Sequence, residues 1–144
     1  MIQIAFCDDD QTVLAQLSAL LEKYRAQRCV QIQCTAFHSP LDLLAEIEKG
    51  TRYDILFLDV IMPAENGITA AKEIRQYDNV VKIIFLTSSA AFADYITVEM
   101  NFNNKVFVVV RTAFTHENIF KLFTWILLDN LLQGGFIIVK LLLL

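Results

Sequence analysis

Short apolar runs alternate along the chain with segments in which apolar residues recur every three or four positions. The runs predict strands at residues 2–7, 30–36, 54–58, 80–87 and 106–110. The periodic segments predict helices that end near residues 28, 50, 77, 100 and 132. Because parallel strands need crossover connections, five strand–helix units predict a parallel sheet with helices on both faces. We therefore expect an α/β fold, a doubly wound (βα)5 protein with a five-stranded sheet in three layers, α/β/α.

The chain of 144 residues fits one domain. Residues 1–132 contain the strand–helix repeat, and residues 133–144 form an apolar tail that begins beside Gly134 and Gly135. The predicted last helix is apolar on nearly all sides, more than one buried stripe requires. We expect that helix to cover another surface, as in a homodimer or against a further domain. The alternative is a thick helix buried in the core of this domain.

Composition narrows the class of protein. Hydrophobic residues make up 56% of the chain and charged residues 19%, which excludes a disordered segment. The net charge of −4 argues against nucleic-acid binding by this segment itself. The three cysteines lack the spacing of a zinc site. With no basic leader and no run of 18 apolar residues, we expect a cytoplasmic protein without a membrane segment.

Acidic residues follow two of the predicted strands directly. Asp8 and Asp9 come after the first strand and Asp59 after the third, while Thr87 ends the fourth. If these strands are neighbours, their carboxyl ends bring the side chains to one edge of the sheet, where ligands bind in such folds. Clustered carboxylates need a cation, and hard oxygen ligands favour Mg²⁺, with Mn²⁺ as the alternative. A carboxylate beside Mg²⁺ can accept a phosphoryl group.

Other residues near these strand ends have simpler interpretations. Asp10 is expected to cap the helix that follows the first strand. Pro63 and Gly67, in the segment after Asp59, are typical turn formers.

The stretches "IAFCDDD", "DILFLDVIMPAENG" and "IIFLTSS" resemble the receiver domain of bacterial two-component response regulators over residues 1 to about 95. The resemblance implies a flavodoxin-like fold. It also implies that an aspartate accepts phosphate from the phosphohistidine of a sensor histidine kinase.

Carried over residue by residue, the resemblance makes Asp59 the phosphoacceptor. Asp8, Asp9 and Asp59 would bind Mg²⁺ together with the backbone carbonyl of Ile61. Thr87 would be the switch hydroxyl that moves onto the phosphoryl group.

The fifth predicted strand departs from the family pattern. Receivers end it with Lys-Pro, whereas this chain reads "NNKVFVVVRTAF". Alignment on the end of the strand makes Arg111 the charge partner of the phosphate. Lys105 is the alternative, although it opens the strand. A guanidinium is not interchangeable with an ammonium, so a phosphate signal could be transmitted poorly.

The segments "FIIVK" and "SSAAFADY" are similar to parts of LytTR-type transcription regulators. This similarity implies a receiver of that subfamily, with residues 133–144 as the start of a truncated output domain. DNA would be bound only through an output domain that is absent from this chain.

Three functions are compatible with the sequence. The first is a phosphorylatable receiver, which modifies its own aspartate and is not a turnover enzyme. The second is a pseudo-receiver, a module that binds partners or dimerises without phosphate. The third, an aspartyl phosphatase, requires a second aspartate two residues after the nucleophile, where Ile61 stands.

Overall fold

The computed structural model describes residues 1–63, 65–87 and 106–110, with Thr87 and residues 106–110 described by their backbone. The elements in chain order are β1 (Ile2–Cys7), α1 (Gln11–Arg28), β2 (Ile32–Phe37), α2 (Pro40–Glu48), β3 (Ile55–Asp59), α3 (Gly67–Tyr77), β4 (Lys82–Thr87) and β5 (Val106–Val110). None of the described helices is long and apolar enough to cross a bilayer.

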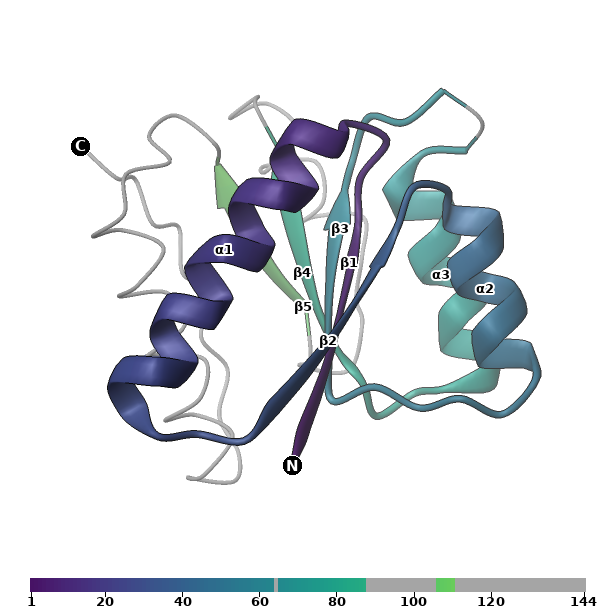
Figure 1. Cartoon of the computed structure of the whole chain (residues 1–144). Coiled ribbons are helices and arrows are strands. Elements are labelled where there is room, and N and C mark those ends of the chain that lie inside the picture. Colours follow the sequence, from purple (N-terminus) through teal and green to yellow (C-terminus); the bar gives the residue numbers. More distant parts are fainter. Residues whose placement is uncertain (64, 88–105, 111–144) are drawn as a thin grey trace.

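The strands form one parallel sheet in the order β2-β1-β3-β4-β5 (Figure 1). This is the flavodoxin-like order, in which the chain winds first to one side of β1 and then to the other. The predicted α/β class with a parallel sheet is therefore confirmed, as is the expectation that the first, third and fourth strands are neighbours. The crevice between the carboxyl ends of β1 and β3 is the position where this topology places a ligand.

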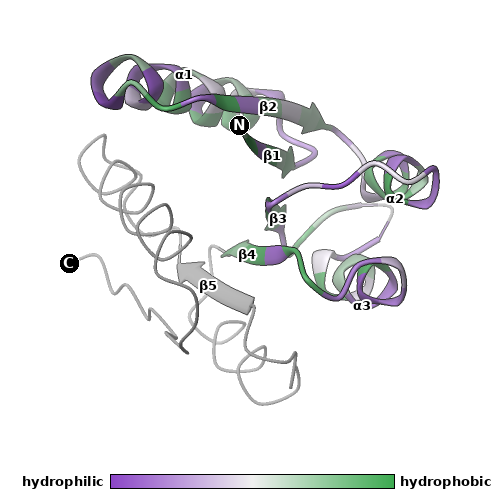
Figure 2. Ribbon diagram, turned by 90° about the horizontal axis from the view of Figure 1, so that it is seen from below, coloured by the Kyte–Doolittle hydropathy of each residue, from purple (hydrophilic) through white to green (hydrophobic). Residues whose placement is uncertain are grey.

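Helices cover both faces of the sheet, with α1 on one face and α2 and α3 on the other (Figure 2). The two faces follow from the alternation of side chains along each strand. In β1, Ile4 and Phe6 pack in the core under α1, whereas Ala5 and Cys7 pack in the core under α2 and α3. The ring of Phe6 meets that of Phe57 on β3 at 5.0 Å between centroids. Burial on both faces explains why these strands read as continuous apolar runs.

The predicted helices at 88–100 and 115–132 and the tail at 133–144 lie outside the described residues. The complete (βα)5 sandwich of three layers, the dimer face on the last helix and the domain boundary near residue 132 therefore stay predictions.

The fourth strand begins two residues later than predicted, at Lys82 rather than at Val80. The cause is Asp78, which follows α3. Its carboxylate Oδ1 accepts hydrogen bonds from the amides of Val80 (2.9 Å) and Val81 (3.0 Å). These two valines therefore belong to a capped turn and not to the ladder. Apolar character alone does not distinguish a valine in a strand from a valine in such a turn.

The second strand also begins later than predicted, at Ile32 rather than residue 30, and ends at Phe37. Helix α1 ends at Arg28, as expected, and Cys29 then adopts a left-handed conformation with φ 52° and ψ 38°. The chain turns back at Cys29, and the next two residues connect it to β2, which starts at Ile32. A β-carbon in this conformation is strained, so the position favours glycine.

We expect Cys29→Gly to raise the free energy of unfolding by about 0.5–1 kcal/mol, since the relief of strain exceeds the entropy that glycine adds to the unfolded chain. The measurement is the urea midpoint at an unchanged slope. Arg28→Gly is the matched control, because the same substitution in the last helical position should lower stability. A lower midpoint for Cys29→Gly would contradict the strain.

Candidate functional site

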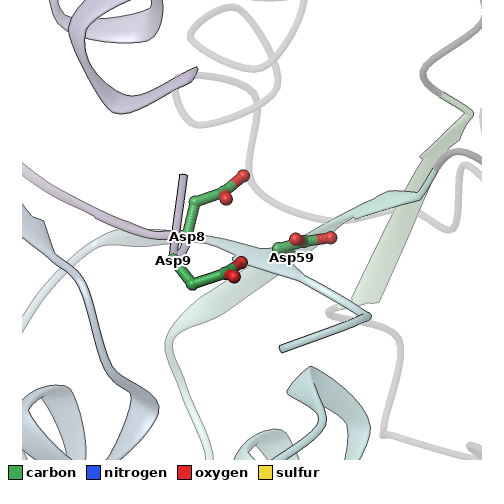
Figure 3. Close-up of side chains that lie close together, drawn as sticks. All are labelled: Asp8, Asp9 and Asp59. Carbon is green, nitrogen blue, oxygen red and sulfur yellow. The ribbon is translucent and has the colours of Figure 1, made fainter. Parts of the chain in front are cut away.

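The predicted acidic residues meet at the carboxyl ends of β1 and β3. Cys7 pairs with Leu58 across these strands, so Asp8, the next residue, emerges beside Asp59. One carboxylate oxygen from each of Asp8, Asp9 and Asp59 lies within 4.8 Å of the others (Figure 3). The structure thus brings together the three side chains that the sequence placed at one edge.

Asp8 is held by the backbone on both sides. Its amide donates to the carbonyl of Phe37 at the end of β2 (3.1 Å), and its Oδ1 accepts from the amide of Asp10 (2.9 Å). Asp10 in turn caps α1, accepting from the amide of Thr12 (2.8 Å), as predicted. Only 2% of Asp8 is exposed, whereas Asp9 is exposed. The start of α1 therefore fixes Asp8 while Asp9 faces solvent.

Asp59 is the last residue of β3 and is 8% exposed. Its Oδ1 accepts a hydrogen bond from the amide of Ile61 (3.4 Å). The residue between them, Val60, donates its amide to the carbonyl of Leu86 on β4 (3.2 Å). The backbone around Asp59 is thus tied to the sheet before the chain enters the loop.

Gly67 packs directly against the backbone of Asp59, a role that the sequence does not reveal. Its amide donates to the carbonyl of Val60 (2.9 Å). A β-carbon at Gly67 would overlap the carbonyl oxygen of Asp59 and lie 3.0 Å from its carbonyl carbon. From the sequence, Gly67 is predicted only to form a turn. In the structure it is the first residue of α3, and its lack of a side chain lets the helix touch the backbone of Asp59.

A pair of sulfur atoms lies under the acidic cluster, and it too was missed. The Cys7 thiol donates to the thioether of Met62 at 3.8 Å, and both residues are buried. Burial raises the pKa of the Cys7 thiol to about 12, and the negative charges of Asp8 and Asp59 add to the effect. The thiol therefore stays protonated and serves as a packing group and a donor. In the sequence, only the methionine of "MPAENG" hints at this contact.

The acidic cluster offers the negative charge and the oxygen ligands that a hard divalent cation requires. The carboxylates of Asp8 and Asp59 lie no more than 4.8 Å apart, so at an effective dielectric near 20 they repel by at least about 3.5 kcal/mol. A divalent ion removes this repulsion, and Mg²⁺ is held in proteins by one or two carboxylates with waters and phosphate oxygens. The three carboxylates fit such an ion, with Asp9 on the solvent side.

The remaining predicted site residues are placed in part. Ile61 lies two residues after Asp59 and is 55% exposed. Its amide donates to Asp59 Oδ1, so its peptide lies beside the acidic cluster. Thr87 ends β4, one residue beyond the backbone partner of Asp59, as the prediction of a shared edge requires. Arg111 and Lys105 lie outside the described residues, so the choice of charge partner stays a prediction.

The sequence is similar to parts of two curated proteins. Transcription factor SKN7 of Saccharomyces cerevisiae is 31% identical over 94 residues, which are 65% of this chain and 14% of that protein. Accessory gene regulator protein A of Staphylococcus epidermidis is 30% identical over 89 residues, 60% of this chain and 37% of that protein. The chain thus matches only a minor part of either relative.

Structural comparison gives the same fold. The response regulatory domain of protein mrkE from Klebsiella pneumoniae superimposes with a TM-score of 0.75 at 19% identity, covering 92% of this chain and all of that one. A family model described as response regulator receiver domain matches residues 4–120. The chain therefore belongs to the response regulator receiver domain family.

Proposed function

We propose that this chain is a phosphoacceptor receiver in which Asp59 takes a phosphoryl group from a sensor histidine kinase in the presence of Mg²⁺. The observation that carries the proposal is the approach of Asp8, Asp9 and Asp59 to within 4.8 Å at the carboxyl edge of the sheet. Receiver domains of two-component systems interact with histidine kinases and use such an acidic cluster for Mg²⁺, and this chain belongs to that family.

In this proposal Asp8, Asp9, Asp59 and the carbonyl of Ile61 would hold the cation, which would neutralise charge on the phosphoryl oxygens. An oxygen of Asp59 forms a bond to phosphorus while the bond from phosphorus to the donor histidine nitrogen breaks. The electron pair of that bond stays on the nitrogen, which takes up a proton. Asp59 suits the role of nucleophile because its backbone is fixed by the Val60–Leu86 and Gly67–Val60 hydrogen bonds.

The signal would leave the site through β4 and β5. We propose Thr87 as the switch hydroxyl, because it ends β4 beside the site, and Arg111 as the charge partner of the phosphate, with Lys105 as the alternative. Added negative charge need shift a two-state surface by only a few kcal/mol. The chain modifies itself once per signal and is not a turnover enzyme.

The output we propose is transcription regulation, carried out by an output domain distinct from the receiver. Both curated relatives carry a regulatory name, one as a transcription factor and one as a gene regulator. The LytTR-type subfamily is our more specific proposal and is supported by "FIIVK" and "SSAAFADY". In it, the apolar last helix would serve as the dimer face.

The test is incubation of the chain with a small phosphodonor, with and without Mg²⁺, followed by measurement of its intact mass. We expect the mass of one phosphoryl group to be added only with Mg²⁺, as an acid-stable and base-labile adduct. Asp59→Asn should abolish the adduct, whereas Asp10→Asn should keep it, because that residue caps α1 and asparagine caps equally well. An adduct that persists in Asp59→Asn would overturn the assignment.

The missing Lys-Pro pair favours a second candidate, the pseudo-receiver that binds partners without phosphate. It predicts no adduct under any donor condition and an oligomeric state that does not depend on Mg²⁺ or donor. Phosphorylation that changes dimerisation would exclude it.

A further inference from the structure

The loop after β3 is held at two points with an exposed residue between them. Val60 and Met62 are buried, with 1% and 7% of their surface exposed, whereas Ile61 is 55% exposed. Hydrogen bonds fix Val60 from Leu86 and Gly67. Within the described part of the chain, Met62 makes no such backbone bond, so its side chain is the second anchor.

The Met62 side chain ends on the segment that carries the other carboxylates. Its sulfur lies 3.8 Å from Cys7 Sγ, and Cys7 is the last residue of β1, directly before Asp8. The contact joins residues 55 positions apart in sequence, at the end of β1 and in the loop after β3. The ladder already pairs Cys7 with Leu58, and this contact extends the connection beyond the ladder to the loop that follows Asp59.

We infer that Met62, seated on the Cys7 thiol, is a positioning residue for the divalent-metal site. It holds the Ile61 peptide in place, so that the Ile61 amide meets Asp59 Oδ1 and Asp59 keeps its distance from Asp8 and Asp9. The inference rests on the proposed metal site and adds a contact that no acidic residue supplies.

Shape rather than polarity makes methionine suitable here. A long, unbranched thioether reaches across the gap to β1, and alanine at the same position ends far short of Cys7. In Met62→Ala the Ile61–Pro63 segment would lose its inner anchor and Asp59 its fixed amide donor. Leucine conserves most of the volume and should keep the anchor.

The experiment measures Mn²⁺ binding by the loss of the free-ion signal in electron paramagnetic resonance, at a temperature where every variant is folded. We expect Met62→Ala to raise the dissociation constant about tenfold, the usual effect of removing support behind metal ligands. Met62→Leu should stay within about twofold of the unaltered chain, since volume is conserved. Cys7→Ala, which removes the sulfur that Met62 contacts, should also raise the constant, by less than the roughly tenfold rise expected for Met62→Ala, because the Met62 side chain keeps its length.

Ile74→Ala is the matched control. Ile74 is fully buried in the same core as Met62, but it lies about two turns of α3 beyond Gly67, the residue that contacts Asp59. It should lower stability by about 2–5 kcal/mol, as core truncations do, and leave the dissociation constant unchanged. If Met62→Ala proves unfolded, Cys7→Ala and Met62→Leu still test the contact from both sides.

The outcomes separate the two proposals. If the unaltered chain binds no Mn²⁺, the proposed metal site fails, and this inference fails with it. If the chain binds Mn²⁺ but Met62→Ala and Cys7→Ala bind it equally well, only the positioning role is overturned. A rise for Met62→Ala that Ile74→Ala reproduces would also overturn it, because the effect would then reflect general loss of core packing.

Discussion

Gly67→Ala is expected to lower the free energy of unfolding by about 3 kcal/mol and to weaken divalent-metal binding at the same time. The added β-carbon would overlap the carbonyl oxygen of Asp59, and it would also lie 3.3 Å from the α-carbon of Val60. These are backbone atoms, so no rotamer change can relieve the overlap. Either α3 or the end of β3 must move, and overpacking of this kind costs about 1–3 kcal/mol, occasionally more.

Chemical denaturation and Mn²⁺ binding measure the two effects of Gly67→Ala. Gly50→Ala is the matched control, since Gly50 has φ +102° but leaves open space where a β-carbon would stand. It should cost about 1–2 kcal/mol through backbone strain and leave metal affinity unaltered. Wild-type stability and affinity in Gly67→Ala would contradict the close approach of α3 to Asp59.

Asp9→Asn should change stability in opposite directions with and without metal. In metal-free solution the substitution removes one of three clustered negative charges, so the melting temperature should rise. With Mg²⁺ at about a hundred times its dissociation constant, the unaltered chain gains about 2.7 kcal/mol of stability. Loss of a ligand should raise that constant at least about tenfold, so at least about half of the gain, roughly 1.3 kcal/mol, disappears. We expect this loss to exceed the stabilisation seen without metal, so the order of the two proteins reverses.

Thermal denaturation in a chelator and in excess Mg²⁺ checks the reversal. Asp10→Asn again provides the control, because it removes the same charge one residue further on, where the side chain faces Thr12 instead of the cluster. It should respond to Mg²⁺ as the unaltered chain does. If Asp9→Asn keeps the full response, Asp9 is not a ligand.

The sheet and the acidic site could be predicted because their signals are local. The predicted strands at 2–7 and 54–58 are continuously apolar from residues 4 and 55 onward, which indicates burial, and the carboxylates that follow them must emerge at one edge of a parallel sheet. Capping by Asp10 is equally local, since its side chain accepts a hydrogen bond from the amide two residues ahead.

The parts that could not be predicted depend on contacts across the fold. The hydrogen bonds of Asp78 decide where β4 starts, although the valines involved have high strand propensity. The approach of Gly67 to Asp59 and the contact of Cys7 with Met62 exist only once α3 and the loop are packed on the sheet. No periodicity in the sequence encodes such distances. The choice between Arg111 and Lys105 requires side chains beyond the described residues.

A crystal structure of the chain with Mg²⁺ and a fluoroberyllate mimic of the phosphoryl group would test the central claim most directly. We predict one Mg²⁺ bound by Asp9 and Asp59, with Asp8 and the Ile61 carbonyl completing the site and the mimic bonded to an oxygen of Asp59. A metal ion that binds elsewhere, or a mimic that leaves Asp59 untouched, would contradict this claim.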